Sequence, residues 1–202
     1  MDIGLKCKCG CVEGVAQNVR PSNGIHLICY CKDCQAFASY LGREQDLLDE
    51  AGGTEIFQIA PADLRISKGK DQIRCVQLSP RLMRWYTDCC KTPIGNTMPN
   101  AKMPFAGVGI SFFNLDSKQS QFNEAFGPIV EKCFGKYCRG PMPPGAKETA
   151  SFSIFGRIGW FILRGLFLGK NKPSPFFDEN GKPVVDPIIL SQEKLKLIYS
   201  SR

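Results

Sequence analysis

The sequence predicts a mainly β protein, α+β overall, in which an antiparallel β domain is followed by a helical C-terminal extension. Strand-like runs separated by Gly, Pro and Asn fill the first 113 residues. Beyond residue 120, Gly-Pro punctuation instead separates segments with helical character. Cysteines also gather in short clusters along the first part. We therefore expect a β domain over residues 1–120 and a helical extension over residues 121–202 that packs on it.

Five runs carry the strand prediction. They cover residues 12–19, 25–30, 54–60, 73–78 and 108–113. Between the second and third runs, residues 33–41 place Ala36, Phe37, Tyr40 and Leu41 at helical spacing. We expect a short helix there, directly after a cysteine cluster.

The C-terminal extension contains an apolar stretch over residues 151–169. Its Arg157 and Arg164 lie seven apart, on one face of a helix, and these two charges argue against a membrane span. Such a helix could lie on a membrane surface, but four glycines weaken it as an autonomous helix, and docking on the β domain is the favoured interpretation. A last helix is expected after Ser191, a good N-cap.

The composition restricts the class of protein. No basic segment followed by an apolar one opens the sequence, so we expect a cytoplasmic protein. In a reducing compartment, eleven cysteines favour metal binding or catalysis over disulfides. The formal charge is +7, but Lys and Arg are dispersed along the chain, which disfavours nucleic-acid binding.

The second cysteine cluster has the most informative spacing. It reads Cys29-Tyr30-Cys31-Lys32-Asp33-Cys34, at the junction of a predicted strand and helix. Three thiolates can hold zinc and leave its fourth tetrahedral position for water or substrate. The helix N-terminus would favour thiolate over thiol. We therefore predict a zinc site formed by Cys29, Cys31 and Cys34.

A second zinc site is predicted from two distant segments. Cys7 and Cys9 flank a turn that Gly10 lets fold tightly. Two ligands rarely suffice, and Cys89 and Cys90 are the best-placed donors of the other two. Such a site would make the protein a zinc-stapled antiparallel β domain, with one or two zinc ions per chain.

The other cysteines and the single histidine are interpreted as structural. Cys75 alternates with Ile73 in a strand and is expected in the core. Cys133 and Cys138 lie in a segment expected to be helical and are interpreted as free thiols, and His26 as an incidental strand residue. With one histidine, sulfur must carry the metal, and an all-thiolate zinc suits thiol chemistry better than hydrolysis.

Three motifs in this order resemble the glutathione-dependent formaldehyde-activating enzyme and centromere protein V family. They are Cys7-Lys8-Cys9-Gly10, Cys29-Tyr30-Cys31-Lys32-Asp33-Cys34-Gln35 and Cys90-Lys91-Thr92-Pro93. The resemblance covers roughly residues 5 to 115. It implies a fold of coiled β-sheets with a structural and a catalytic zinc. By position, the structural ligands would be Cys7, Cys9 and Cys90, and the catalytic set Cys29, Cys31 and Cys34.

Two departures from the family pattern bear on the sites. The family's late motif has two cysteines three apart before a Gly, whereas Thr87 and Lys91 occupy the first and last of those places here. The fourth ligand would then come from Cys89 or Cys11, unless the site is three-coordinate or empty. Tyr30 also stands where the family commonly has His.

The resemblance implies an enzyme of carbon–sulfur lyase type. Its substrate would be a small thiol adduct such as S-hydroxymethylglutathione, whose thiolate takes the open zinc position. The alternative hypothesis is a non-catalytic zinc module with the C-terminal part as a partner surface.

Overall fold

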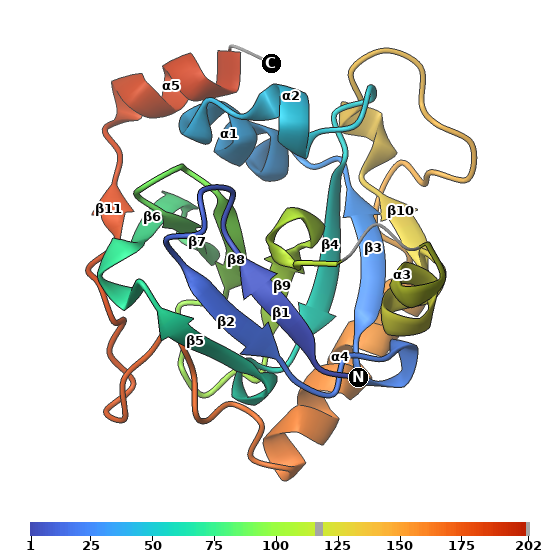
Figure 1. Ribbon diagram of the computed structural model, residues 1–202. Helices are drawn as coiled ribbons and strands as arrows, with labels where there is room; N and C mark the ends of the chain where they lie inside the picture. Colours follow the sequence, from blue (N-terminus) through green and yellow to red (C-terminus); the bar gives the residue numbers. More distant parts are fainter. Residues whose placement is uncertain (116–118, 201–202) are drawn as a thin grey trace.

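A computed structural model describes residues 1–115 and 119–200 of the chain. The fold is α+β and mainly β, as the sequence predicts, with two sheets and helices at both ends (Figure 1). The smaller sheet has the order β1-β2-β5 and is antiparallel. Its strands are β1 (Ile3–Lys6), β2 (Glu13–Ala16) and β5 (Leu64–Lys68).

The larger sheet has eight strands in the order β10-β3-β4-β9-β8-β7-β6-β11. The bounds are β3 (Ile25–Cys29), β4 (Thr54–Ile59), β6 (Ile73–Ser79), β7 (Leu82–Thr87), β8 (Pro93–Thr97), β9 (Ala106–Gly109), β10 (Glu131–Cys133) and β11 (Ile188–Ile189). The six central strands pair antiparallel. The short β10 and β11 pair parallel with β3 and β6, so the C-terminal third supplies both edges of this sheet.

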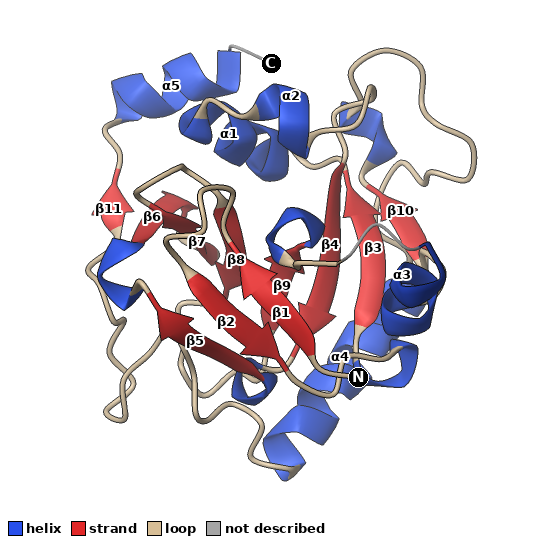
Figure 2. Cartoon of the chain, in the orientation of Figure 1, coloured by secondary structure: helices blue, strands red, loops and turns tan. Residues whose placement is uncertain are grey.

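The main core lies between the two sheets, which Figure 2 shows one in front of the other. Apolar side chains of β1 and β2 meet those of β4 and β7, and Phe57 and Trp85 are fully buried there. Phe113 packs edge-to-face on Phe57. Such aromatic burial is the main apolar contribution to stability in a sandwich of this kind.

The helices gather in two groups. At one end lie α1 (Lys32–Leu41), α2 (Glu44–Leu47) and α5 (Gln192–Ser200), and at the other end lies α4 (Phe152–Phe167), with α3 (Gln119–Phe126) beside β3 (Figure 1). The Tyr199 hydroxyl of α5 donates to Asp33 of α1 (2.7 Å). Within the described residues, every helix is too short or too polar to cross a bilayer.

The structure corrects two local expectations from the sequence and confirms a third. The strand expected over residues 108–113 ends at Gly109, because the chain leaves the ladder and η4 (Ile110–Phe112) turns Phe112 into the core. The helix expected around Cys133 and Cys138 is wrong: β10 pairs with β3 there, and η5 (Gly135–Tyr137) follows. The N-cap predicted at Ser191 is confirmed, since its hydroxyl accepts from Lys194 N (3.3 Å).

Candidate metal centres

The first centre joins two turns that are about eighty residues apart in sequence. One turn connects β1 to β2 and carries Cys7 and Cys9, and Gly10 has the left-handed φ of 75° that the tight turn requires. The other connects β7 to β8 and carries Cys89 and Cys90. The four sulfur atoms lie within 4.8 Å of one another, and we call them the four-thiol cluster.

The spacing of these sulfurs fits a tetrahedral ion. Four thiolates at about 2.3 Å from zinc stand about 3.8 Å from one another. The Sγ–Sγ distances are 3.6 Å for Cys7–Cys9, 3.9 Å for Cys7–Cys89, 3.4 Å for Cys9–Cys89 and 3.8 Å for Cys89–Cys90. The cluster could therefore hold a metal ion, with Cys89 rather than Cys11 as the fourth thiol.

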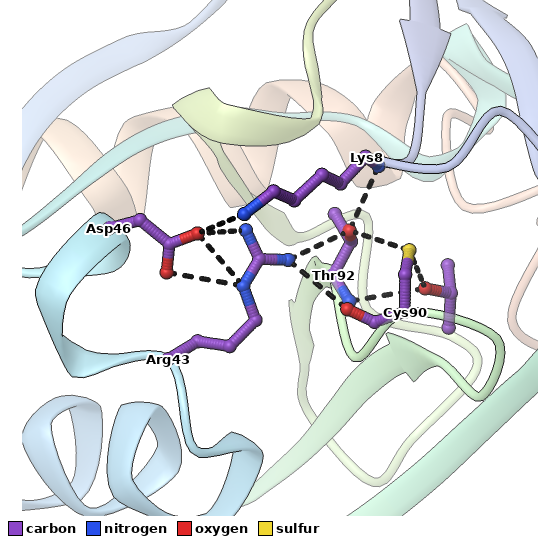
Figure 3. A network of polar contacts seen from close by, with 6 residues as sticks. Lys8, Arg43, Asp46, Cys90 and Thr92 are labelled. Atoms are coloured by element: carbon purple, nitrogen blue, oxygen red, sulfur yellow. Dashed lines mark hydrogen bonds and ion pairs between the residues drawn. The ribbon is translucent and has the colours of Figure 1, made fainter.

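Two threonine hydroxyl groups contact the Cys90 sulfur and favour its thiolate form. The Thr92 hydroxyl oxygen accepts from Lys8 N (3.1 Å) and Arg43 Nη1 (3.0 Å), so its own hydrogen can point to Cys90 Sγ at 3.1 Å (Figure 3). Thr87 places a second hydroxyl 3.5 Å from the same sulfur. Burial raises the pKa of Cys90, but the contacts with the Thr87 and Thr92 hydroxyls, together with hydrogen bonds to Cys9, outweigh it and lower the pKa to about 5. A thiolate is the form that binds a metal.

Thr87 and Lys91 flank the two cysteines of the second turn. Thr87 contacts Cys90 through its hydroxyl and supplies no sulfur. Lys91 has a left-handed φ of 53°. Gly is the residue that adopts this conformation without steric cost.

The second centre wraps the junction of β3 and α1. Cys29 ends β3, Cys31 is the N-cap of α1, and Cys34 lies in its first turn. Cys34 N donates to the Cys31 sulfur (3.4 Å), so the helix start is organised by a ligand candidate itself. The three sulfurs lie within 4.8 Å of one another and form the three-thiol cluster.

A buried arginine compensates the charge of this cluster. Arg84 of β7 is 2% exposed, and its Nη1 lies 3.9 Å from Cys34 Sγ. The thiols of Cys29 and Cys31 and this guanidinium hold the pKa of Cys34 well below its usual range. This environment favours the thiolate form of Cys34.

A cavity of about 440 Å³ lies over the three-thiol cluster. Its walls include all three cysteines, the polar side chains of Arg84 and Gln58, and apolar side chains of α4. Arg84 Nη2 and Gln58 Oε1 are buried, and neither has a hydrogen-bond partner among the described residues. The cavity thus offers an unpaired donor and an unpaired acceptor beside the sulfurs.

Sequence reasoning did not place Cys133 or Arg84 at this centre. Cys133 of β10 is the direct Cα partner of Cys29 and lines the same cavity. Its thiol donates to Ile28 O (3.5 Å), and its sulfur is outside the mutually close three. Only the parallel pairing of β10 with β3 reveals this position, and the segment around Cys133 gave no strand signal.

The remaining candidates lie apart from both centres. Cys75 is fully buried, as predicted. His26 is buried with its ring nitrogens 3.0 Å from Gly127 O and 2.7 Å from Glu55 Oε1, which fits a structural role. Tyr30 is buried, and its hydroxyl donates to Asp49 (3.0 Å). Within the described residues, Tyr30 is not part of the cavity wall.

The fold and these centres define an α+β protein with two cysteine clusters that could each hold a metal ion, one of them at a cavity. Residues 2–188 match DUF6151, a family of unknown function, and the chain belongs to that family. A crystal structure of a Rhodobacter sphaeroides protein is similar over 61% of this chain and 97% of its own, at 18% identity and a TM-score of 0.39. No curated protein matches the chain.

Proposed function

We propose that the protein is a zinc-dependent carbon–sulfur lyase-like enzyme acting on a small thiol adduct such as S-hydroxymethylglutathione. Zinc at the four-thiol cluster is structural in this proposal, and zinc at Cys29, Cys31 and Cys34 is catalytic. The observation that carries the proposal is the three-thiol cluster in the wall of a cavity, because three protein ligands leave a coordination position for a substrate.

The lining of the cavity suits a substrate with carboxylate and amide groups. Arg84 Nη2 offers an unpaired N–H and Gln58 Oε1 an unpaired acceptor, and an unpaired buried polar group costs free energy until a ligand satisfies it. Arg81, Lys32 and Asp33 line the same cavity, so the cations outnumber the carboxylates in its wall. Glutathione carries carboxylates, amides and a thiol, so the lining fits that class of molecule.

The reaction needs no oxidant. In the releasing direction the C–S bond of R–S–CH₂–OH breaks, its electron pair stays on sulfur, and the hydroxyl proton leaves to water as formaldehyde forms. A zinc ion at the three thiolates would supply the Lewis acid that accepts the sulfur as thiolate. The chain's own contribution is to bind the substrate through Arg84 and Gln58 and to shield the sulfur with apolar residues of α4.

A non-catalytic zinc module is the second candidate, and one observation favours it. Cys133 is the direct strand partner of Cys29, so a modest rotation of its thiol would bring a fourth sulfur toward the three-thiol cluster. A four-thiolate site is closed and structural.

The deciding experiment combines metal content with a count of thiolates. Elemental mass spectrometry of protein purified without chelator should give two zincs per chain. Cobalt exchanged into the Cys9→Ser variant should then show charge-transfer absorption of three thiolates at the remaining site, unchanged by Cys133→Ser and lost with Cys31→Ser. Loss of a fourth thiolate band with Cys133→Ser would instead support the structural module.

Activity is measured with formaldehyde and glutathione, following adduct formation above the uncatalysed rate. Wild-type protein and Cys133→Ser should both accelerate it, and Cys31→Ser should not. Protein with two zincs that leaves the background rate unchanged would overturn the lyase proposal for this substrate.

A further inference from the structure

Helix α4 has two apolar faces, and only one of them is covered. Ile154 is buried, and Ile158 and Phe161 pack with it against β3 and β4. Through this face the helix packs on the larger sheet. The other face, which we call the outer face of α4, consists of Phe152, Phe155, Trp160, Leu163, Leu166 and Phe167, with exposed fractions of 97%, 57%, 67%, 57%, 46% and 92%. Phe155 lies at its edge and also lines the cavity over the three-thiol cluster.

The outer face is continuous and uncharged. At 100° per residue its six side chains fall on one arc, and the exposed Gly156 and Gly159 fall within it. Arg157 and Arg164 project at the border between the outer and the buried face, and α4 contains no acidic residue. Exposed apolar patches of this kind in otherwise ordinary proteins mark interaction sites.

A basic hollow lies at the C-terminal end of this helix. It has a volume of about 210 Å³, and Arg20, Arg164 and Lys170 line it together with Asp63, which pairs with Lys170 (2.7 Å). Two of the three cations are therefore left without an ion pair among the described residues. Arg164 reaches this hollow from the border of the outer face, whereas Phe161 and Gly165, which also line it, lie on the face of α4 that packs on the β domain.

We propose that the outer face of α4 binds the surface of an anionic lipid bilayer, with the helix lying in the interface and not spanning it. Trp, Phe and Leu on one side and flanking Arg are the pattern of interfacial helices, and the arginine stems can lie along the acyl boundary while their guanidinium groups reach phosphates. Arg157 and Arg164 at the border of the outer face complement anionic headgroups, whereas a second copy of the chain would bring a second set of the same cations to this border.

Trp160 provides an intrinsic probe. The chain has two tryptophans, and Trp85 is fully buried in the core, so a change in emission on adding vesicles reports on Trp160. The full chain is mixed with phosphatidylcholine vesicles, with or without about a third of phosphatidylglycerol. The expected result is co-sedimentation with the anionic vesicles, a blue shift of Trp160, and loss of both as salt is raised.

Two variants test the surface, each with a matched control. Leu163→Ser/Phe167→Ser should weaken anionic vesicle binding about tenfold or more, because interfacial binding scales with buried apolar area. Arg157→Ala/Arg164→Ala should weaken it about fivefold for each charge. Ile189→Ser/Leu197→Ser and Lys194→Ala/Lys196→Ala remove equally exposed apolar groups and charges from β11 and α5, away from α4 (Figure 1), and should not change it.

The named residues of both α4 variants are exposed, so circular dichroism and zinc content should match the wild type. Wild-type protein that stays in the supernatant with anionic vesicles would overturn the proposal. So would vesicle binding that both α4 variants retain. A wild-type dimer that Leu163→Ser/Phe167→Ser converts to monomer, without vesicle binding, would assign the face to a second copy and also overturn it.

Discussion

The Thr92 hydroxyl oxygen accepts hydrogen bonds from Lys8 N and Arg43 Nη1, and this directs its own hydrogen to the Cys90 sulfur (Figure 3). Thr92→Val keeps the shape of the side chain but removes the donor to the Cys90 thiolate. We expect zinc affinity at the four-thiol cluster to fall by about tenfold, in the range measured for outer ligand partners. Competition with a chromophoric chelator measures it. Thr149→Val, at an exposed position, is the control, and equal affinities in both variants would contradict the role of Thr92.

Arg84 is the cation buried beside the three-thiol cluster. Arg84→Met removes the charge that offsets three thiolates, so we expect zinc at this cluster to bind about tenfold or more weakly and zinc content to fall toward one per chain. Arg84→Lys should restore part of the loss. Two zincs retained through chelator challenge by Arg84→Met would show that the guanidinium does not support the metal.

Sequence spacing predicted those site residues that are neighbours in sequence, but not those that the fold brings in from a distance. The cysteines of each short cluster were predicted because neighbours in sequence share a turn or a helix start. Arg84 approaches Cys34 across fifty residues, and Cys133 approaches β3 across 105. Neither has a local pattern that distinguishes it from an ordinary surface arginine or a free thiol.

At the scale of elements, the start of α4 depends on one carboxylate. Glu131 of β10 accepts hydrogen bonds from Ser151 N (3.0 Å), from the Ser151 hydroxyl and from Lys147 Nζ (3.0 Å), and Ser151 caps α4. Burial raises the pKa of Glu131, but the bonds from Ser151 and Lys147 outweigh it and lower the pKa below the usual glutamate value. This carboxylate therefore couples the edge of the large sheet to α4.

Glu131→Gln should lower the free energy of unfolding by about 1–3 kcal/mol at neutral pH. Because the folded pKa is depressed, this contribution is present above the pKa of an unfolded glutamate and is lost as pH falls through the folded value. Urea unfolding at neutral and acid pH, with the exposed Glu148→Gln as control, measures both effects. A difference between the variants that does not shrink in acid would contradict this account.

The pattern-based prediction of elements was right for some runs and incomplete for others. The helix after the second cluster and the runs at 25–30, 54–60 and 73–78 match α1, β3, β4 and β6 closely, whereas the runs at 12–19 and 108–113 are strand only in part. The six-residue strand β7 was not predicted, and neither were shorter strands such as β1, β5, β10 and β11. Such short segments carry little periodicity and become strands because a distant partner offers a free edge.

At the scale of the whole molecule, the four-thiol cluster fastens the small sheet to the large one. We expect Cys9→Ser to lower the melting temperature by several degrees. The reason is that a metal at this cluster binds the folded state, where the two turns meet and close a long loop, and not the unfolded chain. Cys31→Ser, at the three-thiol cluster, should change the melting temperature less. Cys11→Ser is the matched control, since Cys11 is an exposed thiol near Cys9 outside the cluster. Equal melting temperatures for Cys9→Ser and Cys11→Ser would contradict a fastening role.

The parallel strands β10 and β11 have a consequence for how the chain avoids its own copies. An uncovered strand edge presents a row of free N–H and C=O groups and templates pairing with another molecule. β10 pairs with Leu27, Ile28 and Cys29 of β3, and β11 pairs with Val76 and Gln77 of β6, so the part of the chain beyond residue 120 covers a portion of each outer strand. A chain that stopped at residue 120 would leave the outer edges of β3 and β6 uncovered along their whole length, and we expect it to self-associate more readily than the full chain.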